Sequence, residues 1–508
     1  MSSVKQSKSG PIHFVVSTGT EKAGPELRKF IRSHVMQGKN KGKKLPPRTR
    51  KPKTAGAQAP PQVSALAPPS DPDAARLAPC QSRPPSNGFH LYDVQVTIQR
   101  NRLSPVACIS YADKWIDPRS VEVIFQFSTI AKALLFPLEQ CIVFENKAEQ
   151  WVGPLGVDPA FLHAMIFSAQ TFLDSQASPS GLFIGSPSKK ALPHLIKAIE
   201  LLRERFADDA DEEERKSLTT VSTITSLAVL AHAAGDASSA RNHLEGLYKI
   251  VELRGGLESF EGSEKSSVEV LRTDIGIALF HGSRTRFFSG DDGEEGLVEL
   301  PDLSPLVPGG IVNRVPKGIE SSNVNKELVG TWKTLRDFSA VANYASGTRK
   351  LISMKTYGDF MISTMYSLLK MDFSGAKGSL DEVVRLGLLA YSASVFLQWK
   401  KMTHSRSGPY PYLAGLLRKA LKGMGKEVEP ELGLWLIMVG AVAVLDVAGE
   451  DEQWVGDALR AQMELCGVRE WGELRRILER VMWIGLVHDV PGKQVVQGVA
   501  KKVAADGR

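Results

Sequence analysis

Cysteine is scarce in this sequence. The 508 residues contain four cysteines, Cys80, Cys108, Cys141 and Cys466, and none of them stands in a Cys-x-x-Cys pair. This spacing excludes a zinc finger built from neighbouring residues. It is also typical of a reducing compartment, in which thiols stay free. We therefore expect no disulfide framework and no sequence-local metal site.

Long apolar runs are also missing. The longest run spans residues 432–447, is interrupted by glycines and by Asp446, and falls short of the roughly 20 residues that cross a bilayer. The N-terminus has no apolar signal core. The sequence therefore predicts a buried helix at 432–447 and a soluble protein with no membrane partner.

The common catalytic and phosphate-binding motifs do not occur. The sequence contains no His-Glu-x-x-His, no Gly-x-Ser-x-Gly and no Gly-x-x-x-x-Gly-Lys-Ser/Thr. For the histidines of the body we prefer a structural role, satisfied by hydrogen bonds, to metal ligation. They are His163, His194, His232, His243, His281, His404 and His488. We therefore predict no catalytic residue, no cofactor and no bound metal.

Acidic residues are almost absent from the first part of the chain. Residues 1–53 carry fourteen lysines and arginines against Glu21 and Glu26, a net charge of +12. Because the whole chain carries +7, residues 54–508 carry −5. The high isoelectric point therefore belongs to the N-terminal arm. The acidic remainder gives no general reason to expect affinity for nucleic acid.

The densest part of this arm is residues 39–53, called here the basic tract. Its cations are Lys39, Lys41, Lys43, Lys44, Arg48, Arg50, Lys51 and Lys53. Nuclear import receptors read such clusters, which can also contact DNA phosphates weakly and without regard to sequence. No aromatic residue interrupts the tract, so bases have nothing there on which to stack. We favour nuclear import over phosphate contact, and a solvated tail without a specific role stays open.

Three segments with different patterns divide the chain. In residues 1–38, an apolar run at 11–16 predicts a short strand, and the spacing of Leu27, Phe30 and Val35 predicts an amphipathic helix with a basic face. Residues 39–89 are basic and proline-rich. Burial of their few large apolar side chains could not offset the entropy of ordering, so we expect a disordered linker. Residues 90–500 make up a helical domain.

From residue 121 onward the apolar spacing is helical almost throughout, which predicts an all-α domain. A loop at 290–318, rich in Gly, Pro and acidic residues, separates two lobes, and the one alternation typical of a strand lies at 92–98. One helix is expected to start after Asp158. The others are expected at 190–206, 217–234, 236–254, 328–344, 355–369, 380–399, 412–423, 432–447, 451–466 and 470–487.

The triplet Arg254, Gly255 and Gly256 could be mistaken for an anion-binding loop. Phosphate-binding glycines precede a helix N-terminus, where the helix dipole is positive. These glycines follow a helix instead, so they are expected to accept the left-handed conformation beyond its C-terminus. We predict a structural helix cap.

The segment 243–257, with the sequence HLEGLYKIVELRGGL, resembles part of a known domain. It is similar to the all-helical fungal-specific transcription factor domain that follows a Zn2Cys6 cluster in many fungal regulators. Further similar phrases occur in the same order at 271–280 with Arg286 and Phe287, at 380–390, at 434–440 and at 471–484. The phrase FIRSHVM at 30–36 resembles the start of a subgroup that has a basic stretch and no zinc cluster.

The resemblance implies a nuclear fungal regulatory protein, with metabolic or secondary-metabolite genes as a reasonable target class. In the family, six cysteines hold two zinc ions and read DNA. This sequence has no such array, so zinc-dependent base readout is not carried over. We predict a non-enzymatic regulator whose partners are the transcription machinery or a DNA-binding protein, an import receptor and, weakly and non-specifically, DNA. The alternative is a cytoplasmic helical scaffold or adaptor that does not bind DNA.

Overall fold

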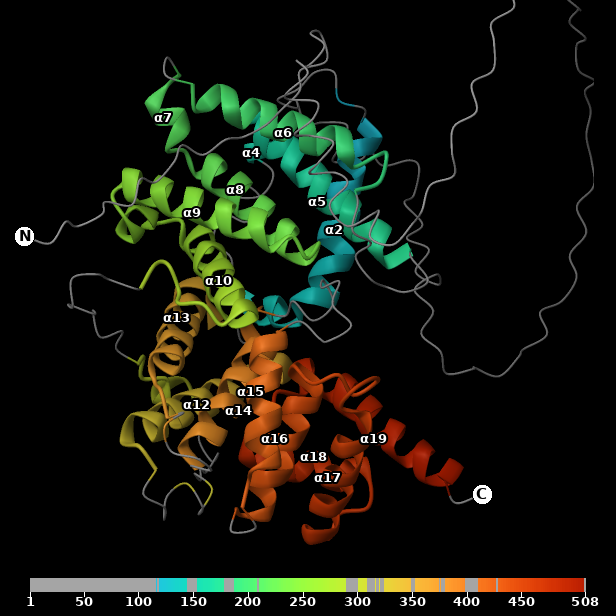
Figure 1. Ribbon diagram of the computed structural model, residues 1–508. Coiled ribbons are helices and arrows are strands. Elements are labelled where there is room, and N and C mark those ends of the chain that lie inside the picture. The colour runs from blue at the N-terminus through green and yellow to red at the C-terminus, as the bar shows by residue number, and fades with distance from the viewer. Residues whose placement is uncertain are drawn as a thin grey trace, which may run out of the picture. The chain divides into compact units, whose positions relative to one another are not determined.

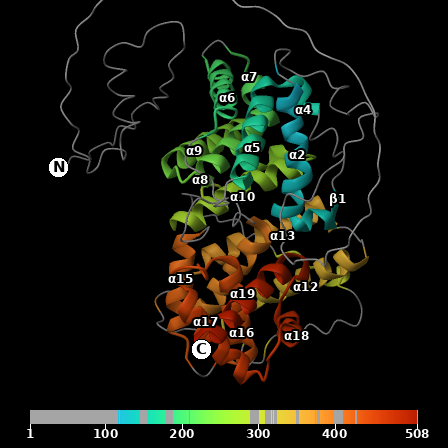
Figure 2. The same cartoon turned by 90° about the vertical axis from the view of Figure 1, so that its right-hand side faces the viewer.

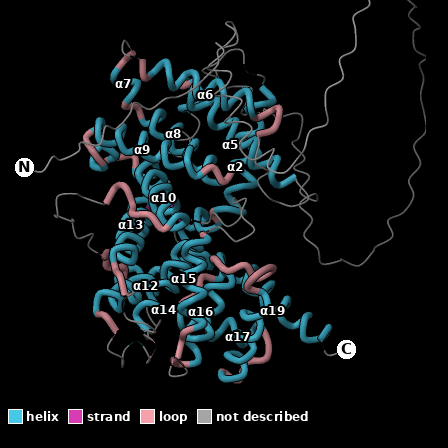
Figure 3. Tube along the Cα trace, in the orientation of Figure 1, coloured by secondary structure: helices cyan, strands magenta, loops and turns pink. Residues whose placement is uncertain are grey.

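The computed structural model of this chain is helical in nearly all of the residues it describes (Figures 1 and 3). The described residues are 116, 118–143, 153–177, 187–207, 210–288, 300–307, 316, 319, 324–348, 352–373, 375, 380–397, 410–425 and 428–506. The all-α prediction is confirmed. The expected strand and basic helix of residues 1–38, the linker at 39–89 and the strand at 92–98 lie outside the described residues.

A first group of helices lies in the upper part of Figure 1 and encloses two hydrophobic clusters. The helices are α2 (Pro118–Leu135), α4 (Gly153–Val157), α5 (Pro159–Ala177), α6 (Leu192–Arg205), α7 (Glu212–Arg215), α8 (Leu218–Ala233), α9 (Ala237–Arg254) and η4 (Leu257–Phe260). The segment η3 (Pro137–Cys141) follows α2 in the chain, but its Leu138 packs in the second, larger core. Side chains set their starts. The Asp158 carboxylate accepts the Phe161 N–H at 2.9 Å before α5, and Ser217 accepts the Thr220 N–H before α8.

A second group forms a larger core in the lower part of Figure 1. It comprises η5 (Ser304–Leu306), α12 (Lys326–Thr348), α13 (Met354–Lys370), α14 (Leu380–Ser392), the π-helical segment η6 (Ala393–Leu397), α15 (Pro411–Lys422), α16 (Pro430–Ala443), α17 (Glu452–Leu465), α18 (Trp471–Val481) and α19 (Gly485–Asp506). Helix α16 is buried at every position from Leu432 to Ala443. Such a helix, apolar all round, belongs inside a large core.

Helix α10 (Glu264–His281) lies between the two groups in Figures 1 and 2. One of its faces, with Leu271 and Ile275, belongs to the second core. The opposite face, with Val270 and Ile277, belongs to the first core. The two expected lobes therefore share this helix, which packs on α8 and α9 on one side and on α13 and α15 on the other.

A short parallel pairing adds a second link. Strand β1 (Ile142–Val143) pairs with β2 (Ile352–Ser353), with Ile142 opposite Ile352. The two strands are far apart in sequence, and each has only two residues. Because segments this short show no period-2 alternation, the pair could not be predicted from the sequence.

Several predicted helix ends were wrong. The expected helix 470–487 is two helices, because α18 stops at Val481 and α19 starts at Gly485 and continues to Asp506. Side chains stabilise the break: the His488 imidazole accepts the Ile484 N–H, and the Trp483 indole donates to Asp489. The helix expected at 380–399 changes to π-helical geometry at residues 393–397. The helix expected to reach residue 447 ends at 443.

Candidate functional site at the junction of the two helix groups

The basic tract, the main functional prediction from the sequence, lies outside the described residues. The site described below is therefore the junction around α9 and α10, where the phrases at 243–257 and 271–287 fall. These phrases carry the resemblance noted above. The polar residues of these two phrases connect neighbouring helices, as described below.

The triplet Arg254–Gly255–Gly256 ends α9. Gly255 has a φ of 105°, in the left-handed region. Its N–H donates to the Glu252 carbonyl at 3.0 Å, and the Gly256 N–H donates to the Val251 carbonyl at 2.9 Å. This pair of bonds is a Schellman motif, which satisfies carbonyls that the helix end leaves open.

The Arg254 side chain ties this cap to neighbouring turns. Its guanidinium donates to the Lys216 carbonyl, just before α8, and to the Ser259 carbonyl at 3.3 Å in η4. It also lies over the Phe260 ring, 5.4 Å from the ring centroid. All three contacts are within the chain. Arg254 therefore links the end of α9 to the turn before α8 and to η4.

Asp274 forms the centre of the junction, which we call the Asp274 joint. The carboxylate is 1% exposed and accepts the backbone N–H groups of Arg286 and Phe287 at 2.7 and 3.1 Å. It also accepts the Tyr366 hydroxyl of α13 at 2.9 Å. One side chain on α10 therefore fixes the segment that follows α10 and joins it to the second helix group.

Two opposing effects act on the Asp274 carboxyl. Burial disfavours the charged form, whereas the hydrogen bonds from Arg286, Phe287 and Tyr366 favour it. Burial is the larger effect and raises the pKa of Asp274 to about 6. Burial, together with the nearby Asp274, raises the pKa of Tyr366 well above its usual value, so its hydroxyl remains a donor.

Aromatic contacts hold the segment after α10 on both sides. The Arg286 guanidinium lies 3.8 Å from the centroid of the Tyr248 ring on α9 and pairs with Glu245 at 3.1 Å. The Phe288 ring lies 4.0 Å from the ring of Tyr366. Stacked, partly shielded arginines of this kind add about 0.5–2 kcal/mol. The joint therefore links α9, α10 and α13.

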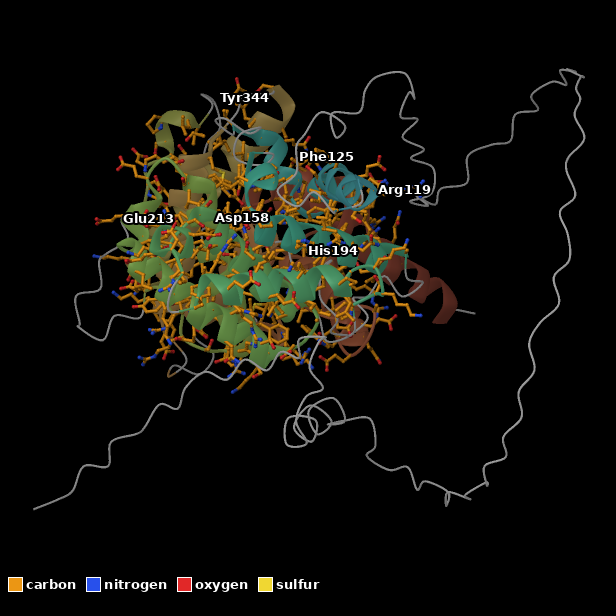
Figure 4. The ribbon with its side chains drawn as sticks, turned by 90° about the horizontal axis from the view of Figure 1, so that it is seen from above. Arg119, Phe125, Asp158, His194, Glu213 and Tyr344 are labelled. Carbon is orange, nitrogen blue, oxygen red and sulfur yellow. The ribbon has the colours of Figure 1, made fainter. Side chains whose placement is uncertain are left out.

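A second polar cluster, centred on Arg205, joins α5, α6 and α8. Arg205 is 5% exposed and donates to Asp158 at 2.6 Å, to Glu214 at 2.8 Å and to Thr220 at 3.0 Å. Burial acts to raise the pKa of Asp158, but hydrogen bonds from Arg205 and from the Phe161 N–H outweigh it, and the net pKa is lowered. Figure 4 shows Asp158 among the N-terminal helices and the exposed Glu213 toward their edge.

A histidine pair links α5 to α6. The Nδ1 atoms of His163 and His194 are 2.9 Å apart, so one ring donates to the other. Burial, with a smaller contribution from His163, lowers the pKa of His194 to about 4. These histidines are 31 residues apart in sequence, and no local motif predicts the contact.

Metal ligation has no support in the described part of the chain. There, no group of three or more His, Cys, Asp or Glu side chains is arranged to hold a metal ion. Cys141 is buried and Cys466 partly buried, and both are free thiols. With only four cysteines in the sequence, the residues do not fit a six-cysteine zinc cluster. Among the described helices, none combines the length and apolarity of a membrane-spanning segment.

The fold and the junction define an all-α domain whose two largest cores share one helix. Residues 125–293 match the family model described as the fungal-specific transcription factor domain. The resemblance to this domain is thereby confirmed. The match includes the phrases at 243–257 and 271–287, and those at 380–390, 434–440 and 471–484 lie beyond it. No curated protein matched the chain in a sequence search, and no solved structure matched it either.

Proposed function

We propose that this protein is a fungal transcription regulator that works in the nucleus without a zinc cluster of its own. The observation that carries the proposal is the match of residues 125–293 to the fungal-specific transcription factor domain. The four scattered cysteines support the second part, because six are needed for the usual DNA-reading element. Metabolic or secondary-metabolite genes are the proposed targets.

The charge distribution supports separate roles for the basic tract and the helical domain. The basic tract, eight cations within residues 39–53, supplies the nuclear import signal. The helical domain carries a net negative contribution and no comparable basic run, so its role is to bind protein partners. These partners are the transcription machinery or a DNA-binding protein that reads the promoter. Direct DNA contact is limited to weak, salt-sensitive binding through the basic tract.

Localisation of fluorescent fusions in a fungus tests the import role. The full chain is compared with a variant in which all eight cations of the basic tract are replaced by glutamine. A matched control exchanges each lysine for arginine and each arginine for lysine, which preserves the charge. We expect nuclear signal for the full chain and the control and its loss in the glutamine variant. Cytoplasmic signal for all three would favour the scaffold or adaptor role.

Chromatin immunoprecipitation tests the regulatory role independently. We expect enrichment at a limited set of promoters, because a partner supplies the sequence specificity. Mobility-shift assays over a salt series, with the full chain and with residues 55–508, separate direct from indirect binding. A steep salt slope that disappears in the shorter chain indicates phosphate contact by the arm. The absence of both chromatin enrichment and transcription-factor partners would refute the proposal.

A further inference from the structure

Helix α6 carries an exposed apolar stripe. Among the described residues, ten large apolar side chains are exposed, and three of them, Leu192, Ile196 and Phe206, lie on α6 or directly after it. Each of the other seven lies on a different element. With the half-buried Ile199 between them, the three follow at spacings of four, three and seven residues, so they share one side of the helix. A contiguous apolar surface of this kind is typical of an interaction site, whereas single exposed apolar side chains are common.

The stripe is separate from the face that holds α6 in the domain. That face, with Ala198 and Leu202, is buried and packs on α5. Because successive residues are about 100° apart around a helix, Ile196 and Leu202 point about 120° apart. Figures 1 and 2 show α6 near the upper end of the first helix group. The apolar stripe is therefore not part of the core, and Ile196 is 45% exposed.

The charges beside the stripe differ between the two ends of α6. Lys189 and Lys190 are exposed just before its N-terminus. Near its C-terminus, Glu204 is exposed, and the following helix α7 adds the exposed Glu212 and Glu213. Glu213 is labelled in Figure 4. One end of this surface is therefore positive, and the other end is negative.

We propose that the stripe is a dimer interface, on which a second copy of this chain packs its own α6 in the antiparallel direction. A two-fold axis passes by Ile199. Leu192 then faces Phe206 of the second copy, because each lies seven residues from Ile199. A two-fold interface uses the same patch on both copies, so the patch must be complementary to itself.

The charges select the antiparallel direction. With the two α6 helices antiparallel, the lysines before each N-terminus face the acidic end of the other copy. A parallel pair would instead bring lysines against lysines and glutamates against glutamates. The helix dipoles favour the same choice, because the positive N-terminus of one helix then lies beside the negative C-terminus of the other.

Arg203 is the one charged residue within the stripe, between Ile199 and Phe206. An arginine can lay its carbon stem along apolar side chains and keep its charge in water. About the axis at Ile199, the two copies of Arg203 are eight residues apart along the pair, or about 12 Å. This separation exceeds the screening length of about 8 Å at physiological ionic strength, so their repulsion is small.

The interface is small. Helix α6 has 14 residues, or about 21 Å of helix, and meets one helix of the second copy. The buried area is therefore at the low end for specific interfaces, and we expect a weak dimer with a Kd on the order of 10 μM. Dimerisation through α6 does not depend on the basic tract or on a nuclear role.

Sedimentation velocity of the full chain between about 1 and 200 μM tests the dimer. We expect mainly monomer at the lowest concentration and mainly dimer at the highest. Ile196→Lys places a charge opposite Arg203 of the second copy and should weaken association at least tenfold, with a melting temperature close to that of the wild type because the position is exposed. The control Leu465→Lys changes an exposed leucine on α17 and should leave the Kd unchanged.

A pair of charge-reversal variants tests the direction of packing. The first combines Lys189→Glu with Lys190→Glu, and the second combines Glu204→Lys, Glu212→Lys and Glu213→Lys. Each variant alone should associate more weakly than the wild type, because like charges then meet at both ends. An equimolar mixture of the two should recover association, because each acidic end then meets a basic one.

Four results would overturn the proposal. They are a chain that stays monomeric over the whole concentration range, an Ile196→Lys variant that dimerises like the wild type, a Leu465→Lys variant that loses association to the same extent, and a mixture of the charge-reversal variants that associates no better than either alone. The mixture decides the question even if Ile196→Lys fails to fold.

Discussion

The Asp274 joint predicts that the stability of the protein depends on pH. The sign of this dependence is set by whether burial or hydrogen bonding has the larger effect on the pKa of Asp274. Burial raises the pKa of Asp274 to about 6 in the folded chain, against an ordinary value of 3.8. The folded state therefore binds a proton more tightly than the unfolded state. As a result, stability from this residue is present at low pH. It is lost as the pH rises from about 4 to about 6.

The expected size follows from the two pKa values. The complete loss amounts to about 3 kcal/mol, because a difference of one in pKa corresponds to about 1.4 kcal/mol. Between pH 4.5 and pH 7.0 the same relation gives about 2 kcal/mol. The comparison variant is Asp274→Asn, which has nearly the same shape and does not titrate. The free energy of unfolding of the wild type should therefore fall relative to Asp274→Asn by about 2 kcal/mol across this range.

Urea unfolding, followed by circular dichroism at several pH values, measures this difference. Taking the difference between the two proteins cancels the contributions of the other titratable groups. If the wild type instead becomes more stable relative to the Asp274→Asn variant as the pH rises, the reasoning is wrong. That result would mean that the hydrogen bonds from Arg286, Phe287 and Tyr366 outweigh burial. A flat difference would show that the two effects cancel.

Two further predictions concern single positions. Gly255→Ala places a Cβ at a φ of 105° and should cost about 1–2 kcal/mol in urea unfolding. The control Gly246→Ala, inside the same helix with open space around it, should stabilise the protein by about 0.5–1 kcal/mol. Equal effects of the two substitutions would refute the role of Gly255 as the helix cap. Arg205→Met leaves the buried Asp158 unpaired and should cost about 3–5 kcal/mol. Adding Asp158→Asn should recover part of this loss, and a double variant no more stable than Arg205→Met would contradict the assigned pairing.

Local signals in the sequence were sufficient for most of the helices and poor for their ends, and the ranges of α2 and α10 were not predicted individually. Asp158 and Ser217 are strong N-caps, and a glycine in the left-handed conformation ends α9, so these boundaries were predicted nearly to the residue. The break between α18 and α19 was missed because Ile484 is capped by His488, which looks like any helical histidine in the sequence. The contact spans only four residues, but histidine is not one of the residues that usually mark the start of a helix.

The polar clusters could be recognised only in the folded structure. Asp274 reaches Tyr366 across 92 residues, and Arg336 reaches the carbonyls of α18 across 144 and 145 residues. Neither pair has a spacing that a local motif could reveal. By contrast, the count of four cysteines is read directly from the sequence. Helices with local signals can therefore be predicted from the sequence, whereas contacts between charged or polar side chains far apart in the chain cannot.

The matched segment 125–293 cannot be a complete structural unit, because α10 serves both cores. Cutting after residue 293 removes the helices that cover Leu271 and Ile275, while Val270 and Ile277 keep their packing in the first core. We expect a fragment of residues 116–293 to bind a hydrophobic dye and to aggregate, whereas the full chain does neither. Replacing Leu271 and Ile275 by glutamine in the fragment should reduce both effects. Matched replacement of Val270 and Ile277 should unfold the fragment instead. A soluble, monomeric fragment that melts like the full chain would show that the second helix group is a separate attachment, and not part of the same folding unit.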